Sequence, residues 1–147
     1  MNTSISTLLE SKGGALRTVS ASVTVSDAVQ EMNRHKIGAI LVMQGLNLAG
    51  IFTERDVLTR VVAGSLDPKT TPITKVMTAD VLTIAPTATV QEVMDIFTNR
   101  RCRHLPVVED GQLRGLISIG DVSRWVANSH RAEAESLRQY ISGGLST

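Results

Sequence analysis

The sequence predicts a mixed α/β (α+β) fold: two β-α-β-β-α repeats packed about a pseudo-two-fold axis, followed by a longer C-terminal helix. The first observation is a duplication, because GIFTERDV at 50–57 recurs 65 positions later as GLISIGDV, in one ungapped register that begins at Thr18 and Thr83. The second is the pattern of each copy, in which capped amphipathic helices alternate with short apolar strands. A unit of about 60 residues is marginal alone, so the copies are expected to bury their faces against each other.

The elements are predicted in the same order in both copies. In the first copy they are an extended piece, a helix, two strands and a second helix: Arg17–Val19, the helix from Thr24, Ile37–Met43, Leu48–Phe52, and the helix starting near Asp56. In the second copy they are Val81–Ile84, the helix from Thr89, Leu105–Val108, Leu113–Ile117, and the helix starting near Asp121. Turns at 44–47 and 109–112 join the paired strands.

Both first helices are predicted to begin at a capping box. Thr24 with Asp27, and Thr89 with Glu92, have the spacing at which a hydroxyl and a carboxylate bind the unpaired amides of a helix start. Each helix then places three apolar residues on one face: Ala28, Val29 and Met32 in the first copy, and Val93, Met94 and Phe97 in the second.

The copies and their connector divide the chain into five predicted segments. They are an N-terminal lead-in at 1–16, the first repeat at 17–64, a connector at 65–77, the second repeat at 78–126, and a helix extension and tail at 127–147. The connector contains Pro68 and Pro72. The first ten residues are polar enough for a frayed start or a short helix.

The last helix is predicted to run longer in the second repeat and to end at Gly143-Gly144. Its apolar positions recur at steps of three and four: Val122, Trp125, Val126, Ala132, Leu137, Tyr140 and Ile141. Either this tail folds back on its own core, or it forms an apolar seam that another subunit covers. The seam is favoured, because Trp125 and Tyr140 lie beyond the needs of the repeat itself.

Composition excludes several classes of partner. The 147 residues include 15 Lys and Arg against 14 Asp and Glu, so a formal charge of +1 offers no strong field for nucleic acid or an anionic membrane. Four aromatic residues are too few for a base-stacking platform. No apolar stretch is long enough for a membrane span, and no early apolar run follows a basic start. A cytoplasmic location is therefore expected.

Catalytic and metal-binding patterns do not emerge from the sequence. The three histidines, His35, His104 and His130, are scattered, and Cys102 with His104 makes at most two metal ligands. No G-x-S-x-G, P-loop or G-x-G-x-x-G motif is present. Cys102 stands opposite Ile37 in the repeat, which favours a small buried apolar residue over a nucleophile. The sequence therefore predicts a protein that is not an enzyme.

Three features together resemble a pair of CBS domains, also called a Bateman module. They are the G-h-x-[ST]-x-x-D motif at the end of each copy, the run RCRHLPVVEDG at Arg101–Gly111, and the β-α-β-β-α order. The resemblance covers Thr18–Val126 and is to stand-alone bacterial CBS-pair proteins, whose trailing helix is similar around Ala132–Glu135. It implies a regulatory module that binds adenine nucleotides (AMP or ATP, and in some relatives NAD(H)) in clefts between the repeats.

The same resemblance implies partners and leaves alternatives. A stand-alone module has no effector domain, so occupancy would be signalled to an unknown effector protein, and paired modules of this family are expected to form a homodimer. One alternative is a structural or adaptor dimer whose nucleotide clefts are vestigial. Another is an enzyme that acts on a nucleotide, although no base lies near a nucleophile in the sequence. No catalytic cofactor is expected.

The motif positions that carry the binding chemistry are two hydroxyl–aspartate pairs. Thr53 and Asp56, and Ser118 and Asp121, lie three residues apart at a predicted helix start. From spacing alone they are either capping boxes or anion sites made of free amides and a hydroxyl. The family resemblance implies that Asp56 and Asp121 hold ribose hydroxyls, as acidic residues do in dinucleotide folds, while Thr53 and Ser118 approach phosphate.

The resemblance further implies two cross-assembled clefts of unequal charge. One joins the Asp56 motif to lead-in and strand residues of the second copy: Thr78, Val81, Thr83, Arg103, His104 and Pro106. The other joins the Asp121 motif to the Gly13–Thr18 lead-in and to Ile37, Gly38 and Ala39. Val81 and Ile37 would line the adenine. Arg103 and His104 are either a solvated basic patch or phosphate contacts; their counterparts Gly38 and Ala39 are uncharged, so the first cleft is expected to prefer a charged phosphate.

Overall fold

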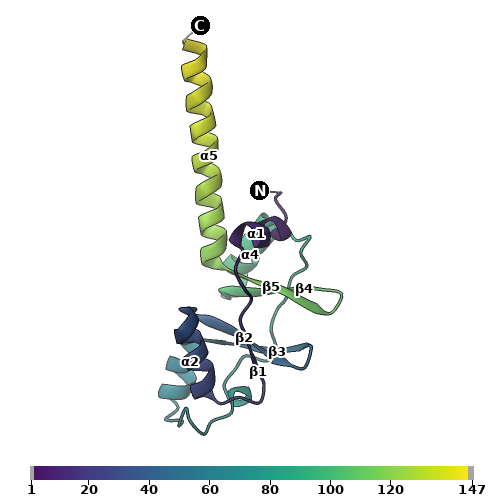
Figure 1. Cartoon of the computed structure of the whole chain (residues 1–147), viewed down its shortest axis with the longest axis vertical. Coiled ribbons are helices and arrows are strands. Elements are labelled where there is room, and N and C mark those ends of the chain that lie inside the picture. Colours follow the sequence, from purple (N-terminus) through teal and green to yellow (C-terminus); the bar gives the residue numbers. More distant parts are fainter. Residues whose placement is uncertain (1, 146–147) are drawn as a thin grey trace. The chain divides into compact units, whose positions relative to one another are not determined.

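The computed structural model describes residues 2–145, with the side chains of 140 and 142–145 outside the description. Its order is α1 (Ile5–Lys12), β1 (Thr18–Ser20), α2 (Val25–His35), β2 (Ala39–Gln44), β3 (Asn47–Thr53), α3 (Glu54–Asp56), a π-helix (Val57–Val62), a 3₁₀ turn (Ile73–Lys75), α4 (Val90–Arg100), β4 (His104–Glu109), β5 (Gln112–Ser118) and α5 (Ile119–Leu145). Figure 1 shows this mixed architecture with its long last helix, which confirms the predicted fold class.

Two compact units make up the chain. The helical unit comprises Met1–Gly13, Thr87–His104 and Ile117–Thr147, and the sheet unit comprises Gly14–Pro86 and Leu105–Leu116. Each unit therefore takes residues from both copies of the repeat. The hairpin of the second copy lies mainly in the sheet unit, whereas the two long helices on either side of it in sequence lie in the helical unit.

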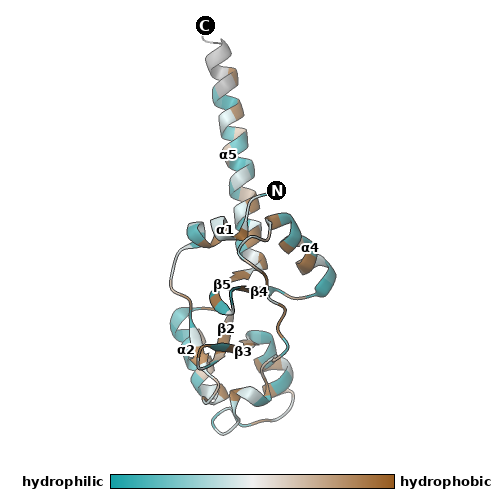
Figure 2. Ribbon diagram, turned by 90° about the vertical axis from the view of Figure 1, so that its right-hand side faces the viewer, coloured by the Kyte–Doolittle hydropathy of each residue, from teal (hydrophilic) through white to brown (hydrophobic). Residues whose placement is uncertain are grey.

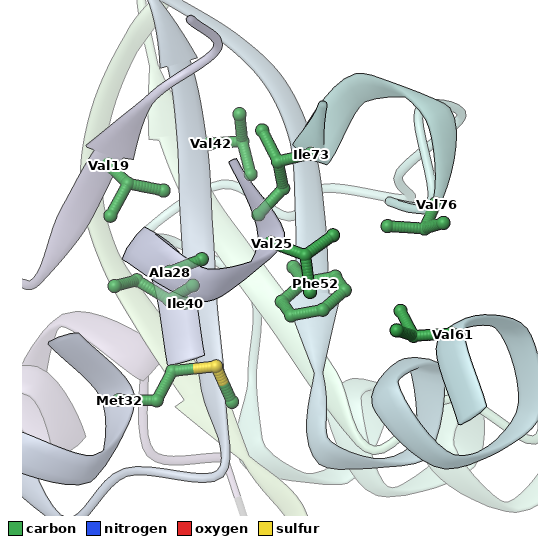
Figure 3. Packing of buried hydrophobic residues seen from close by; sticks show 10 residues of the cluster. All are labelled: Val19, Val25, Ala28, Met32, Ile40, Val42, Phe52, Val61, Ile73 and Val76. Carbon is green, nitrogen blue, oxygen red and sulfur yellow. The ribbon is translucent and has the colours of Figure 1, made fainter. Parts of the chain in front are cut away.

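The sheet unit is built on three strands in the order β1-β2-β3, with β1 parallel and β3 antiparallel to β2. The predicted Thr24–Asp27 capping box starts α2. Ten buried residues from α2, the strands, the π-helix and the connector form the main core, labelled in Figure 3: Val19, Val25, Ala28, Met32, Ile40, Val42, Phe52, Val61, Ile73 and Val76. Burying a side chain as large as Phe52 contributes about 1.5–3 kcal/mol, so this layer fixes the strand that ends at Thr53.

The opposite face of the sheet is covered by the second copy. Ala39, Leu41 and Ile51 form a smaller cluster against which Leu113 and Leu116 of β5 pack. Successive residues of β2 point to opposite faces. Because both faces are buried, β2 reads as a continuous apolar run, typical of a strand covered on each side.

The second copy lacks the first strand that the sequence predicts. Within Val81–Ile84 only Ile84 bridges Val107, in the parallel sense, and this bridge lies 65 positions after the Val19–Val42 pair of the first copy. The preceding ladder bond would need an N–H at Pro106, and proline has none. Its counterpart Leu41 carries an N–H, and β1 there continues to Thr18.

The helical unit packs α1, α4 and the start of α5 together. The chain before α1 runs antiparallel to the residues that cap α4: the Ile5 amide donates to the Ala88 carbonyl at 2.8 Å and the Val90 amide to the Thr3 carbonyl at 2.9 Å. The predicted Thr89–Glu92 capping box is present. Each helix buries apolar residues: Ile5 and Leu8 of α1, Val90, Val93 and Phe97 of α4, and Val122 of α5. Of the two alternatives for the start of the chain, a frayed segment or a short helix, the structure has the helix.

Helix α5 continues through Gly143-Gly144 to Leu145, so the prediction that these glycines end it is wrong. Glycine permits a left-handed helix end but does not require one. Leu137 and Ile141 are 60% and 51% exposed, so this part of α5 does not fold back on the chain's own core. Figure 2 shows hydrophobic segments recurring among hydrophilic ones along the helix. None of the helices within residues 2–145 combines the length and hydropathy of a membrane span.

Candidate ligand-binding site

Each copy carries the same polar turn where its last strand meets its last helix. In the sheet unit the Thr53 amide donates to Asp56 Oδ2 at 3.0 Å, and the Asp56 amide donates to Thr53 Oγ1 at 3.2 Å. In the helical unit the Ser118 amide donates to Asp121 Oδ2 at 2.8 Å, and the Asp121 amide to Ser118 Oγ at 3.1 Å. Both pairs are therefore capping boxes. The helices begin at Glu54 and Ile119, two residues before each aspartate.

Both motif carboxylates are nearly buried. The Asp56 side chain is 11% exposed and the Asp121 side chain 8%. A capping carboxylate on a helix surface is usually solvated, whereas these two keep only a small opening to solvent. A buried carboxylate needs hydrogen-bond donors or cations. The surroundings of the two aspartates supply these in different ways.

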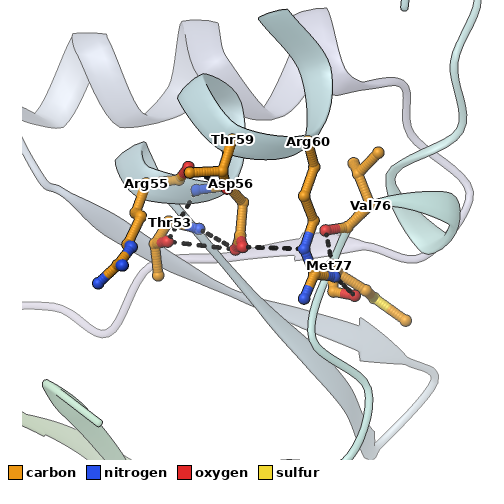
Figure 4. Close-up of polar contacts among 7 residues, drawn as sticks. All are labelled: Thr53, Arg55, Asp56, Thr59, Arg60, Val76 and Met77. Atoms are coloured by element: carbon orange, nitrogen blue, oxygen red, sulfur yellow. Dashed lines mark hydrogen bonds and ion pairs between the residues drawn. The ribbon is translucent and has the colours of Figure 1, made fainter. Parts of the chain in front are cut away.

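Arg60 is the cation beside Asp56 (Figure 4). Its Nε lies 3.6 Å from Asp56 Oδ1, and its Nη1 donates to the carbonyls of Val76 and Met77, each at 3.2 Å. Arg60 lies on the π-helix, a widened turn that is frequent at functional sites. One guanidinium therefore connects the Asp56 carboxylate to the chain segment that enters the second repeat.

The segment after Met77 is held against β3. Thr78 and Ile51 exchange backbone hydrogen bonds, both of 2.9 Å. This approach is possible because residue 50 is glycine: a Cβ there would lie 2.7 Å from the Thr78 carbonyl oxygen and 2.7 Å from Met77 Sδ. The Gly50 backbone thus positions Thr78 beside the strand that leads to the Asp56 motif.

Asp121 is bound by two cations. Lys12 Nζ, from the end of α1, lies 2.9 Å from Oδ2, and Arg124 Nη2 lies 2.6 Å from Oδ1. Burial raises the pKa of Asp121, but the Ser118 amide and the Lys12 ammonium lower it by more, so the pKa lies below its usual 3.8. The amide of Ile119 donates to the Arg103 carbonyl at 2.9 Å, which brings the Arg103 backbone to this turn.

The remaining predicted site residues fall into the same two units. In the sheet unit, Glu54 donates its amide to the Gly38 carbonyl at 3.0 Å, Val81 packs against the Ala39 cluster, and Thr18 pairs with Leu41. Ile37 is half-buried, Pro106 is buried, and Thr83 is exposed. In the helical unit, Arg103 is exposed and His104 half-buried. The cross-assembled clefts, which combine residues of both units, stay a prediction.

Sequence reasoning missed the three cations around the aspartates. Arg60 follows Asp56 by four residues and Arg124 follows Asp121 by three, spacings at which a helix brings acid and base together. That signal was available in the sequence. Lys12 lies 109 residues from Asp121, so no local pattern could have identified it. Within residues 2–145 the structure groups no three His, Cys, Asp or Glu side chains that could hold a metal ion.

Comparison with known proteins gives the same picture of two repeats. The family model described as CBS domain matches residues 15–63 and 73–128. A relative from Arabidopsis thaliana, the mitochondrial CBS domain-containing protein CBSX3, is 38% identical over 97% of this chain and 74% of its own. The solved CBS-domain containing protein ATU1752 from Agrobacterium tumefaciens is 36% identical, with a TM-score of 0.78 over 83% of this chain and 98% of its own.

A more distant solved protein shares the fold. CBS domain protein PAE2072 from Pyrobaculum aerophilum, solved as a complex with AMP, is 23% identical to this chain. Its TM-score is 0.71, over 81% of this chain and 89% of its own.

Proposed function

Because this chain belongs to the CBS-domain family, we propose that it is a regulatory module that binds adenine nucleotides reversibly and signals their occupancy to a partner protein. AMP and ATP are the first ligands proposed, and NAD(H) the third. We propose that it acts by binding without chemical turnover, in the cytoplasm. The AMP held by PAE2072 supports this choice of ligand class, while the likeness itself is one of fold.

The observation that carries the proposal is the duplicated, nearly buried aspartate at a strand–helix junction. A ribose carries two neighbouring hydroxyls, and a carboxylate can accept a hydrogen bond from each. Asp56 and Asp121 keep this acceptor at 11% and 8% exposure beside cations, which suit a phosphate on the same ligand. A surface capping box that only started a helix would need neither the burial nor the cations.

The other residues of the two clefts are also part of the proposal. Asp56 would be joined by the Thr78–Thr83 lead-in and by Arg103 and His104, and Asp121 by the Gly13–Thr18 lead-in and by residues 37–39. Arg103 would bind phosphate in the first cleft. Replacing it with Ala should then weaken AMP much more than adenosine at that site.

Titration calorimetry on the intact chain tests the proposal. AMP, ATP and NADH are titrated into the wild type, into Asp56→Asn and into Asp121→Asn, with Asp95→Asn as a matched control at an exposed position of α4. Each motif variant should lose a different site, and the control should lose none. Ligand at 100 times its dissociation constant should also stabilise the fold by about 2.7 kcal/mol. Absence of binding with all three nucleotides would overturn the proposal.

A structural or adaptor dimer is the second candidate, and the exposed Leu137 and Ile141 of α5 favour it. We propose a homodimer in either case. The two candidates differ in their response to ligand: an adaptor with vestigial clefts would dimerise but bind no nucleotide. Light scattering together with the calorimetry separates them.

A further inference from the structure

Lys12 donates a hydrogen bond to Asp121, the carboxylate that the proposed function assigns to ribose. It is the last residue of α1, and its Nζ donates to Asp121 Oδ2 at 2.9 Å from the other end of the sequence. The body of α1 is anchored, because Ile5 is fully buried and Leu8 is 3% exposed. The Lys12 side chain is 40% exposed, and the chain turns directly after it at Gly13, with a φ of 60°. A long side chain in this position can change partners without moving the helix.

The Asp121 carboxylate already accepts most of the hydrogen bonds it can. Three donors lie on it: the Ser118 amide at 2.8 Å, Lys12 at 2.9 Å and Arg124 at 2.6 Å. A carboxylate has about four acceptor positions, and a ribose diol brings two donors. One of the three present donors therefore has to leave when the diol binds.

Lys12 is the donor best placed to leave. The Ser118 amide is fixed by the capping box, and Arg124 is on the same helix as Asp121, bound to the other oxygen. Lys12 comes from a different element and shares Oδ2 with the amide. The Asp56 carboxylate has no equivalent arrangement, because its cation, Arg60, lies 3.6 Å away on the following turn and also holds two carbonyls.

We propose that Lys12 makes the Asp121 site selective for phosphorylated ligands, an inference that rests on the proposed function. A diol displaces Nζ from the carboxylate. A nucleotide supplies a phosphate on the same sugar, to which the freed ammonium transfers, so the charge-assisted contact is exchanged rather than lost. A neutral nucleoside also displaces Lys12 from the carboxylate, but it has no phosphate to which the ammonium could bind instead. The charge asymmetry predicted from Arg103 and His104 does not include Lys12, because Lys12 lies before the duplicated region.

The test measures the ratio of adenosine to AMP dissociation constants at one site. Asp56→Asn serves as the parent, so that only the Asp121 site binds, and Lys12→Met is added to remove the charge while keeping the stem. Calorimetry should show AMP weakened and adenosine unchanged or tightened. Because a charge-assisted hydrogen bond is worth about one to two decades in affinity, the ratio should fall at least about 10-fold.

Two further variants make each outcome decisive. Lys12→Arg keeps the charge and should keep the ratio within about twofold of the parent. Lys69→Met, at an exposed position of the connector, should leave both constants unchanged. If the parent binds AMP and Lys12→Met leaves the ratio unchanged, or tightens both ligands equally, this inference is overturned while the proposed function stands. If neither the wild type nor the parent binds a nucleotide, the proposed function itself fails.

Discussion

The two motif aspartates show how one sequence motif acquires different surroundings. Thr53–Asp56 and Ser118–Asp121 have the same spacing, and both form the capping box that this spacing predicts. Their cations do not follow the repeat. Arg60 corresponds to position 125, which is Trp, and Lys12 lies before the duplicated region. The capping bonds and the helix-spaced partners Arg60 and Arg124 could therefore be predicted from the sequence. The contact of Lys12 with Asp121 could not, because the two residues come from elements far apart in the chain.

Replacing Asp121 with Asn is expected to lower the free energy of unfolding near neutral pH and to make it less dependent on pH in acid. The pKa of Asp121 is lowered on folding, so its stabilisation is fully present above its usual pKa of 3.8 and is lost as pH falls through the folded-state pKa. Urea unfolding across this pH range measures the difference in the free energy of unfolding between wild type and variant. This difference should become smaller in acid.

Asp95→Asn controls for the substitution itself, because Asp95 is exposed on α4. The prediction would be contradicted if the difference in unfolding free energy between wild type and Asp121→Asn stayed constant from neutral pH through the acid range. It would also be contradicted if the difference for the control decreased in acid in the same way.

At the scale of elements, the duplication predicts the order but not the extent of each strand. Pairing of Ile84 with Val107 repeats that of Val19 with Val42, yet the ladder stops there because Pro106 has no N–H. The π-helix after α3 is likewise absent from the second copy, where α5 is described as α-helix from Ile119 onward. Propensity and periodicity predict that an element exists, while single residues decide where its hydrogen bonds end.

Gly50→Ala is expected to destabilise the fold by about 1–3 kcal/mol. The added Cβ would lie 2.7 Å from the Thr78 carbonyl oxygen, which is backbone and paired with β3, so the segment cannot retreat without losing its hydrogen bonds. Urea unfolding measures the loss.

Gly38→Ala is the matched control for Gly50→Ala. Its Cβ would lie 3.4 Å from the carboxylate carbon of Glu54, an ordinary contact with the end of a flexible side chain. The control should change stability by no more than about 0.5 kcal/mol. Equal effects at the two positions would show that the close approach at residue 50 is not what matters.

At the scale of the whole molecule, α5 is the element that the duplication does not explain. The predicted apolar seam places Leu137 and Ile141 one turn apart, and both are exposed on the chain. The side chain of Tyr140, also part of the predicted seam, lies outside the described residues. The proposed homodimer would cover this surface.

Leu137→Glu combined with Ile141→Glu is expected to raise the dissociation constant of the homodimer at least about 100-fold. Each buried aliphatic side chain contributes about 1.5–3 kcal/mol, and both subunits lose two. Light scattering over a dilution series measures the change, and truncation after Val126 should have the same effect. Ser136→Glu with Gln139→Glu, at exposed positions of the same helix, is the control. A dimer that survives truncation would show that α5 does not hold the subunits together.

The chain passes between its two compact units four times, after Gly13, Pro86, His104 and Leu116. A gene duplication often leaves two copies that can be expressed apart, but here neither copy contains a complete unit. Cutting in the connector would deprive the face of Ala39, Leu41 and Ile51 of Leu113 and Leu116, its covering residues. Excised halves should therefore aggregate or remain unfolded, and the intact chain should unfold as one cooperative transition. A single repeat expressed alone is therefore expected to fold only when another chain covers this face.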